Sequence, residues 1–226
     1  MTRAEFRRIE DYMLDRMKDS AHDRRHVYRV LNTALDIAAG MDTVEMDVLL
    51  AACLLHDIGR EQQSANLELD HAQIGGEMAY QFLLTWQWPE AKARHVRDCI
   101  VTHRYRGSNP PRSIEAKILF DADKLDASGA LGIARTLIYE GQVGEPLYIL
   151  DEGNSIITEG GGAEISSFFQ EYHFKLKKVY DSFYTDRARE IARERQKTAI
   201  DFYDGLYAEV DENYQKGREW LNELLL

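Results

Sequence analysis

The sequence contains little cysteine and little proline, and each shortage excludes a class of structure. Cys53 and Cys99 are the two cysteines among 226 residues, and no CxxC pair is present. A disulfide framework and a cysteine-bound zinc site are therefore not expected, and both thiols are predicted to be buried. The 4 prolines and 15 glycines leave room for long helices, in a composition that is neither disordered nor fibrous.

A long apolar stretch and an excess of positive charge are also missing. The longest apolar run covers residues 48–55, far fewer than the roughly 20 that a membrane helix needs, and the first segment lacks a signal-peptide core. We therefore expect a cytoplasmic protein without a membrane partner. The 28 Lys and Arg against 39 Asp and Glu give a net charge of −11, which argues against nucleic acid as a partner. An anionic substrate would need a local cationic pocket.

Apolar residues recur at intervals of three and four along almost the whole chain, which is the period of an α-helix. The sequence therefore predicts an all-α fold, a compact multi-helix bundle that forms a single domain over residues 1–226. Helices are expected at residues 46–58, 71–86, 89–103, 113–125 and 127–139.

Capping residues and glycines mark where these helices begin and end. Gly59 is expected to stop the helix that precedes it, and Ser113 and Thr185 are the predicted N-caps. Glycines interrupt the helical pattern over residues 141–164, where we expect a loop or a small hairpin around Gly153. Two long helices are predicted beyond it, over residues 166–184 and 185–210, in a C-terminal region of about 166–226.

Ionisable residues stand at the ends of two strongly apolar segments. His56 and Asp57 close the run VLLAACLLHD, and Asp121, Asp123 and Asp126 follow the apolar residues 118–120. An unpaired buried carboxylate costs several kcal/mol, and a bound cation is the ordinary compensation. For the HD dipeptide alone, a carboxylate that caps a neighbouring helix and bonds to His56 would explain the pattern as well.

A further candidate, His26, lies on the same helical stripe as Val30 and is directed toward the core. His26, His56, Asp57 and Asp123 together offer two imidazoles and two carboxylates. Such a mixed nitrogen and oxygen set suits Mn²⁺, Fe²⁺, Co²⁺, Ni²⁺ or Zn²⁺ rather than Ca²⁺. We expect one divalent transition metal per chain, with manganese favoured and Mg²⁺ as a further candidate.

Three strings in this order, HVYRV, LLHDIG and DADKLDA, resemble the HD-domain superfamily of metal-dependent phosphohydrolases over about residues 21–135. The longer string DADKLDASGALGIAR is similar to a small bacterial subgroup, some members of which are nucleotide pyrophosphohydrolases. The resemblance implies a helical HD-domain bundle whose metal ligands are His26, His56, Asp57 and Asp123. It also implies that Asp57 or Asp126 orients the attacking water or accepts its proton.

His71 and His103 match positions that carry a second metal in binuclear members of the superfamily. Here no second histidine adjoins His103 before Arg104, and the following residues lack the GYP string of cyclic-dinucleotide phosphodiesterases. These departures favour one metal, with His71 and His103 as pocket residues that polarise water or hold phosphate. In the alternative interpretation, both are ordinary core or surface histidines.

The resemblance implies hydrolysis of a small phosphorylated metabolite, namely a nucleoside triphosphate, to the monophosphate and pyrophosphate. Two other interpretations stay open, a binuclear-metal phosphodiesterase and a non-catalytic metal-binding helical signalling domain. A homodimer is compatible with the sequence, and His22, His95 and His173 receive no role. The candidate phosphate-binding cations are Lys124, Arg29, Arg60, Arg104 and Arg135.

Overall fold

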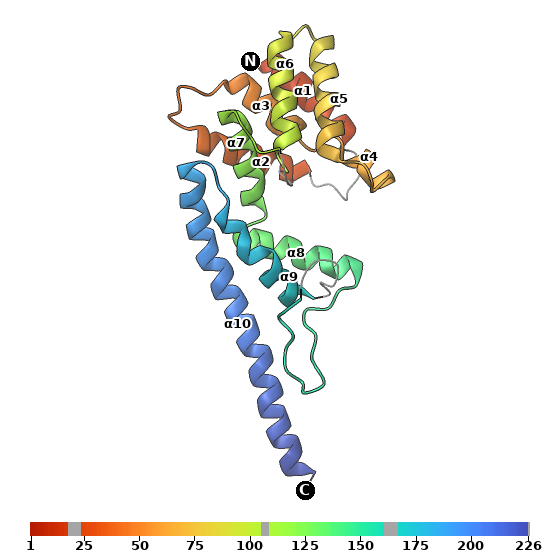
Figure 1. Cartoon of the computed structure of the whole chain (residues 1–226), viewed down its shortest axis with the longest axis vertical. Coiled ribbons are helices and arrows are strands. Elements are labelled where there is room, and N and C mark those ends of the chain that lie inside the picture. The colour runs from red at the N-terminus through yellow and green to blue at the C-terminus, as the bar shows by residue number, and fades with distance from the viewer. Residues whose placement is uncertain (18–23, 105–108, 161–166, 226) are drawn as a thin grey trace. The chain divides into compact units, whose positions relative to one another are not determined.

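The structure, a computed structural model, describes residues 1–17, 24–104, 109–160 and 167–225. Helices account for nearly all regular structure in these residues (Figure 1), which confirms the predicted all-α fold. None of the described helices combines the length and the apolar character that a membrane crossing demands. The elements are α1 (Arg3–Arg16), α2 (Arg24–Ala38), α3 (Met46–Leu55), α4 (Arg60–Ala65), α5 (His71–Thr85), α6 (Glu90–Thr102), α7 (Ile114–Asp126), α8 (Gly129–Val143), α9 (Phe168–Phe174), the 3₁₀ helix η2 (Leu176–Asp181) and α10 (Asp186–Leu224).

The chain divides into two compact units. The first contains Met1–Asp126 and Phe183–Ala188, and the second contains Ala127–Ser182 and Arg189–Leu226. All the predicted metal ligands belong to the first unit, which also includes α1, a helix outside the predicted metal-site region of residues 21–135. That the two units form one domain stays a prediction.

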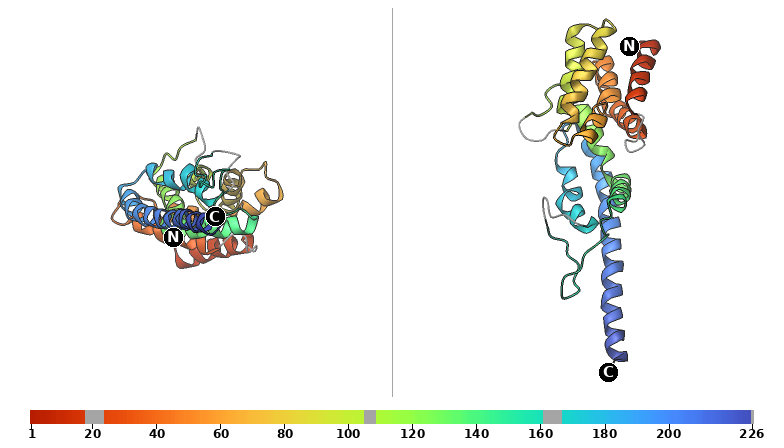
Figure 2. Two further views of the ribbon diagram at one scale, coloured as in Figure 1. Left: turned by 90° about the horizontal axis from the view of Figure 1, so that it is seen from below. Right: turned by 90° about the vertical axis from the view of Figure 1, so that its right-hand side faces the viewer.

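Helix α3 is the centre of the first unit. It packs against α1, α2, α6 and α7, and its residues Val48, Leu49, Leu54 and Leu55 are completely buried. A helix that is apolar on nearly every side needs neighbours on every side, and α3 has them. Around it, α2 packs against α7, and α5 lies beside α6 (Figure 1, Figure 2).

Helix α3 ends at Leu55, three residues before the predicted end. The prediction that Gly59 stops it is wrong, because Gly59 has a φ of −86°, outside the left-handed region, and precedes α4 as its N-cap. A glycine is required at this position instead because a side chain would collide with the backbone of α5. A Cβ at this position would lie 2.3 Å from the His71 carbonyl oxygen and 2.7 Å from the Gly75 nitrogen. This close approach brings the turn after α3 against the start of α5.

Asp121 joins α7 to the start of α10 within the first unit. Its carboxylate accepts hydrogen bonds from the backbone N–H groups of Tyr184 and Thr185, at 2.9 and 2.8 Å, and from the Thr185 hydroxyl at 2.7 Å. The Thr185 hydroxyl oxygen also accepts from the Ala188 N–H, and the Ser113 hydroxyl accepts from the N–H of the third residue of α7. Both predicted N-caps are therefore confirmed.

The second unit has an aromatic core between α8, α9, η2 and α10. The prediction of one long helix over residues 166–184 is wrong, because α9 ends at Phe174 and η2 follows it. The break keeps Leu176 in the same core as Phe169, so tertiary packing overrides the local helical pattern. The hairpin predicted around Gly153 is present as a short antiparallel bridge. The buried residues of this core are Ile133, Phe168, Phe169, Tyr172, Leu176, Ala199 and Tyr203.

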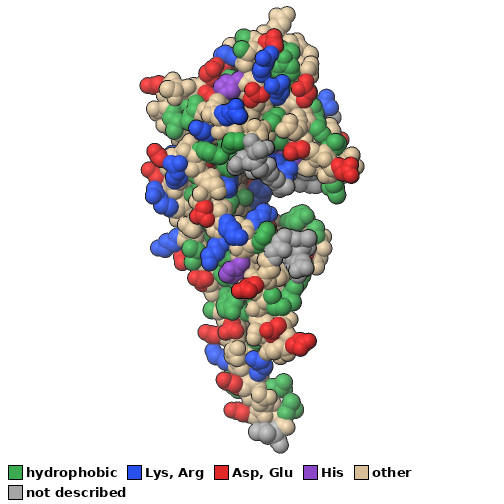
Figure 3. All heavy atoms as spheres, in the orientation of Figure 1, with side chains coloured by type: hydrophobic (Ala, Val, Ile, Leu, Met, Phe, Trp, Pro, Cys, Tyr) green, Lys and Arg blue, Asp and Glu red, His purple; other side chains and the backbone are tan. Residues whose placement is uncertain are grey.

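Charged side chains of both signs are mixed on the surface. On the face shown in Figure 3, Lys and Arg side chains are interspersed with Asp and Glu side chains. The chain as a whole carries a net charge of −11. Neutralisation of a bound anion on that face would therefore depend on a few local cations.

Candidate metal centre

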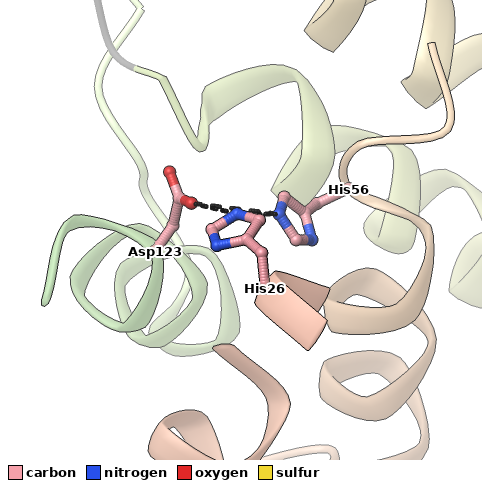
Figure 4. Close-up of side chains that lie close together, drawn as sticks. All are labelled: His26, His56 and Asp123. Atoms are coloured by element: carbon pink, nitrogen blue, oxygen red, sulfur yellow. Dashed lines mark hydrogen bonds and ion pairs between the residues drawn. The ribbon is translucent and has the colours of Figure 1, made fainter. Parts of the chain in front are cut away.

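Three of the predicted ligands meet where α2, the end of α3 and α7 come together. His26 Nε2 lies 3.1 Å from Asp123 Oδ1 and 3.3 Å from His56 Nε2. His56 Nε2 lies 3.9 Å from the same Asp123 oxygen. In Figure 4 the Asp123 carboxylate and the His56 ring flank the His26 ring. One atom from each of the three side chains can therefore bind a common ion.

Asp57 lies between this group and two further histidines. Its Oδ2 atom is 3.6 Å from both His26 Nε2 and His56 Nε2. Its Oδ1 atom is 3.4 Å from His71 Nε2 and 3.7 Å from His103 Nε2. Asp57, His71 and His103 form a second group whose ligand atoms lie within 4.8 Å of one another. Each carboxylate oxygen of Asp57 thus faces one pair of histidines.

The polar atoms of this centre are buried, and several of them are left unpaired. Within the part of the chain that the structure describes, Asp57 Oδ1, His71 Nε2 and His103 Nε2 have no hydrogen-bond partner, although buried polar atoms are normally paired. Asp57 caps no helix among these residues, so helix capping does not explain the HD dipeptide. Unpaired nitrogen and oxygen acceptors that face one another fit a divalent cation.

All four imidazole rings at the centre, those of His26, His56, His71 and His103, have the same orientation relative to it. Each Nδ1 atom lies at hydrogen-bond distance from an oxygen that can only accept, and each Nε2 atom faces the centre. Such contacts on the far side of a ring fix its orientation and leave Nε2 to the metal. The acceptors are the Cys53 carbonyl for His56 at 2.8 Å, the Ile100 carbonyl for His103 at 2.6 Å, Gln63 Oε1 for His71 at 2.6 Å and Asp126 Oδ2 for His26 at 2.7 Å.

Burial lowers the pKa of a histidine ring, whereas a neighbouring carboxylate raises it, and the balance differs among these four rings. Burial lowers the pKa of His56, His71 and His103, which are neutral near pH 7. Burial also acts on His26, but its hydrogen bonds to two carboxylates outweigh it and raise its pKa to about 9. An ion that binds His26 Nε2 must therefore displace a proton, because the ligand form of histidine is the neutral imidazole.

The two central carboxylates are ionised, although Asp57 is buried and Asp123 is partly buried. Desolvation opposes the charge of Asp57, yet the neighbouring His56 and a contact with His71 hold the pKa of Asp57 well below its usual range. Desolvation likewise opposes the charge of Asp123, and the contact with His26 lowers the pKa of Asp123 to about 2. Two carboxylate charges are therefore ready to bind a cation at neutral pH.

The structure separates the three aspartates of α7 by role. Asp123 faces His26 and His56, whereas Asp121 binds the start of α10. Asp126 lies behind His26, where its carboxylate also binds Arg29 through two contacts of 2.7 and 3.0 Å. Because Asp126 meets His26 through Nδ1, this geometry suits a residue that orients the ring better than one that activates water.

The predicted phosphate-binding cations lie in different surroundings. Arg29 is engaged by Asp126, and Arg60 Nε lies 2.8 Å from Asp57 Oδ2. Arg104 Nη1 lies 3.2 Å from His71 Nδ1. Lys124 extends over the Phe120 ring, with Nζ 5.1 Å from the ring centroid. Arg135 belongs to α8 in the second unit, so its participation in the site stays a prediction.

The remaining histidines contribute elsewhere or lie outside the described residues. His95 Nε2 is 3.1 Å from Glu115, and His173 Nε2 is 2.7 Å from the Tyr203 hydroxyl. His22 lies outside the described residues.

Gln63 was not predicted from the sequence as a site residue, although it contacts His71, because it belongs to none of the three strings. A polar residue within a helix of six residues carries no periodic signal that would have singled it out.

The chain is similar to a known domain family and to several known proteins. The HD domain matches residues 24–128. Uncharacterized protein YpgQ of Bacillus subtilis is 30% identical over 197 residues, which cover 85% of this chain and 86% of YpgQ. A crystal structure of YpgQ in complex with ADP superposes with a TM-score of 0.69 and 26% identity, covering 91% of this chain and 95% of that one.

Two further solved structures are described as HD-superfamily hydrolases. The Bacillus thuringiensis protein has a TM-score of 0.70 and 26% identity, covering 92% of this chain and 97% of its own. The protein from an uncultured Thermotogales bacterium has a TM-score of 0.60 and 28% identity, covering 92% of each chain. With His26, the His56–Asp57 pair and Asp123 gathered at one buried centre, the chain belongs to the HD-domain superfamily.

Proposed function

We propose that this protein is a metal-dependent phosphohydrolase that converts a nucleoside triphosphate to the monophosphate and pyrophosphate. The observation that carries the proposal is the buried centre in which His26, His56, Asp57 and Asp123 converge with unpaired acceptor atoms beside them. The relation to HD-superfamily hydrolases supports the reaction class. The ADP complex of YpgQ supports a small phosphorylated ligand.

The four ligands would hold one divalent transition metal, with Mn²⁺ favoured for the mixed nitrogen and oxygen donors. When bound, such an ion lowers the pKa of water and withdraws charge from the phosphoryl group. The role of this chain is to supply ionised Asp57 and Asp123 in a buried site, together with rings held by acceptors behind them. Fe²⁺, Co²⁺, Ni²⁺, Zn²⁺ and Mg²⁺ are the alternatives to be compared.

In this proposal Asp57 orients the attacking water through Oδ1, which has no hydrogen-bond partner in the described residues, and the neutral imidazole of His71 or His103 accepts the proton of that water. His71 and His103 orient the water through Nε2. The water oxygen forms a bond to the α-phosphorus as the bond to the bridging oxygen of pyrophosphate breaks. Asp126 acts through His26. The cations that would bind the phosphates are Lys124, Arg29, Arg60, Arg104 and Arg135, of which Arg29 must exchange part of its contact with Asp126.

The test is product analysis by ion-exchange chromatography over a panel of nucleoside mono-, di- and triphosphates, each with one of the six metals. Pyrophosphate and the monophosphate should appear together from a deoxynucleoside triphosphate. The variant Asp57→Ala should be inactive, and Asp98→Ala on the surface of α6 serves as the matched control. Intact triphosphate as a product, or activity on monophosphates alone, would contradict the assigned bond. Absent turnover with every metal would favour a non-catalytic signalling domain.

A second candidate function, a binuclear-metal phosphodiesterase, is favoured by one observation. Asp57, His71 and His103 lie close enough to bind a second ion beside the first. This function requires about two metals per chain, loss of one of them in His103→Ala, and hydrolysis of a cyclic dinucleotide. Elemental analysis of the wild type and of His103→Ala separates the two functions, since the first requires one metal in both proteins.

The cytoplasmic location and the homodimer stay predictions.

A further inference from the structure

His71 differs from the other histidines of the metal centre in the source of its Nδ1 contact. His56 and His103 follow the last turns of α3 and α6, and each donates its Nδ1–H to the carbonyl three residues earlier. His71 is instead the first residue of α5, so no preceding turn of its own helix offers a carbonyl. Its acceptor has to come from another part of the chain.

Gln63 on α4 supplies that acceptor. Its Oε1 atom lies 2.6 Å from His71 Nδ1, and its Nε2 atom donates to the Leu69 carbonyl at 2.9 Å. Because a carbonyl oxygen only accepts, the Leu69 carbonyl determines which end of the Gln63 amide faces the imidazole. A hydrogen bond from the Leu69 N–H to the Asn66 carbonyl, at 3.1 Å, holds the turn that carries this carbonyl.

Two other neighbours of His71 favour the opposite tautomer. Arg104 Nη1 lies 3.2 Å from Nδ1 and can only donate, whereas Asp57 Oδ1 lies 3.4 Å from Nε2 and can only accept. A proton on Nε2 would satisfy both and would remove the lone pair that faces the centre. The contact with Gln63 is the shortest of the three, and it requires the proton on Nδ1.

We propose that Gln63 is a positioning residue that holds His71 with its proton on Nδ1 and its Nε2 lone pair toward Asp57 and His103. This inference rests on the proposed function, in which His71 Nε2 is an acceptor for water or a ligand. It extends the set of groups behind the imidazoles to a residue of α4. It also gives the short helix α4 a function, since α4 places an amide beside the first residue of α5.

The tautomer can be measured directly in the metal-free full-length protein labelled with ¹⁵N. Long-range ¹H–¹⁵N spectra at about pH 8, where a neutral ring is expected, distinguish the two tautomers, and His71→Gln assigns the His71 signals. The wild type should carry the proton on Nδ1. Gln63→Met removes the acceptor at similar length and should shift His71 toward the Nε2–H form. Gln63→Glu keeps an acceptor oxygen and should preserve the Nδ1–H form, as should the control Gln81→Met on the surface of α5.

Activity of the metal-loaded protein provides a second measurement. Gln63→Met should lower kcat by about 10- to 100-fold with a smaller change in KM, and Gln63→Glu should restore most of the loss. Circular dichroism of each variant checks the fold. A wild-type ring with its proton on Nε2, or an unchanged tautomer in folded Gln63→Met, would overturn the proposal. Because the tautomer is read without metal or substrate, a tautomer shift in a protein that hydrolyses nothing would refute the proposed function alone.

Discussion

Asp126 contacts His26 from the side opposite the metal centre, with 2.7 Å between Asp126 Oδ2 and His26 Nδ1. Arg29 binds the same carboxylate, so an arginine, a carboxylate and an imidazole form a continuous chain that ends at the predicted ion. Contacts of this kind orient a ligand and increase its basicity. Residues that never touch the ion should therefore influence how tightly it binds.

The variant Asp126→Asn keeps the shape of the side chain and removes its charge. We expect metal affinity to fall by about 10- to 100-fold, because His26 loses its anionic partner. Isothermal titration calorimetry with Mn²⁺ measures the change. Asp98→Asn, an exposed aspartate on α6, provides the matched control. Unchanged affinity in Asp126→Asn would mean that this carboxylate does not act through His26.

Replacement of Asp57 tests the centre itself. The purified wild type should contain about one transition-metal ion per chain, and Asp57→Ala should release it because one of two ionised carboxylates is lost. Elemental analysis after dialysis measures both. A wild type without metal, or a variant with the same content, would remove the basis of the proposed site.

Lys124 stands next to a predicted ligand but cannot coordinate an ion while protonated. Lys124→Ala should lower kcat/KM by about 10- to 100-fold, the loss expected for one charge-assisted contact to phosphate, and should leave the metal content intact. Steady-state kinetics and elemental analysis on the same preparation separate the two effects. Lys117→Ala, seven residues earlier on α7, is the control. Equal kinetics in both variants would show that Lys124 binds no substrate.

Asp121 should matter for stability and not for metal binding. Asp121→Ala leaves the Tyr184 and Thr185 donors without their buried acceptor, so the free energy of unfolding should fall by roughly 3 kcal/mol. Asp121→Asn keeps one acceptor oxygen and should lose less. Urea denaturation of the metal-free proteins measures the loss. A drop in metal affinity without a drop in stability would instead assign Asp121 to the centre.

Glu140 on α8 makes stability depend on pH. Burial, reinforced by the charges of Glu145 and Glu171 and opposed by Lys175, raises the pKa of Glu140 from 4.5 to about 7. The native state then binds more protons than the unfolded state between these values, so stability should fall as pH rises from 4.5 to about 7 and stay low above it.

The variant Glu140→Gln mimics the protonated form of this side chain. It should be more stable than the wild type by about 1–3 kcal/mol at about pH 8, and the gain should vanish near pH 4.5. Urea denaturation at both pH values measures the difference. Glu152→Gln, an exposed position, should show no gain at either pH. An equal effect of Glu140→Gln at both pH values would rule out a titrating Glu140.

Much of the first unit could be predicted from local patterns. The helices at residues 71–85, 90–102 and 114–126 lie within one residue of the predicted bounds at each end, because apolar spacing and capping residues act locally. The end of α3 was misplaced, since the turn at Gly59 depends on Gly75, sixteen residues later. The helix over residues 166–184 was wrong for a similar reason, because Leu176 packs into an aromatic core built from three other elements.

By itself, the sequence determined the helical class, the central apolar helix and the three strings that contain His26, the His56–Asp57 pair and Asp123. These follow from spacing along the chain and from residue chemistry. Which of three neighbouring aspartates faces the imidazoles was decided in the tertiary structure, where Asp121 meets the start of α10 and Asp126 meets the back of His26. The partner of His71 was decided there too. Spacing tells which side of a helix a residue occupies, but the atom it meets belongs to another helix, whose position results from packing.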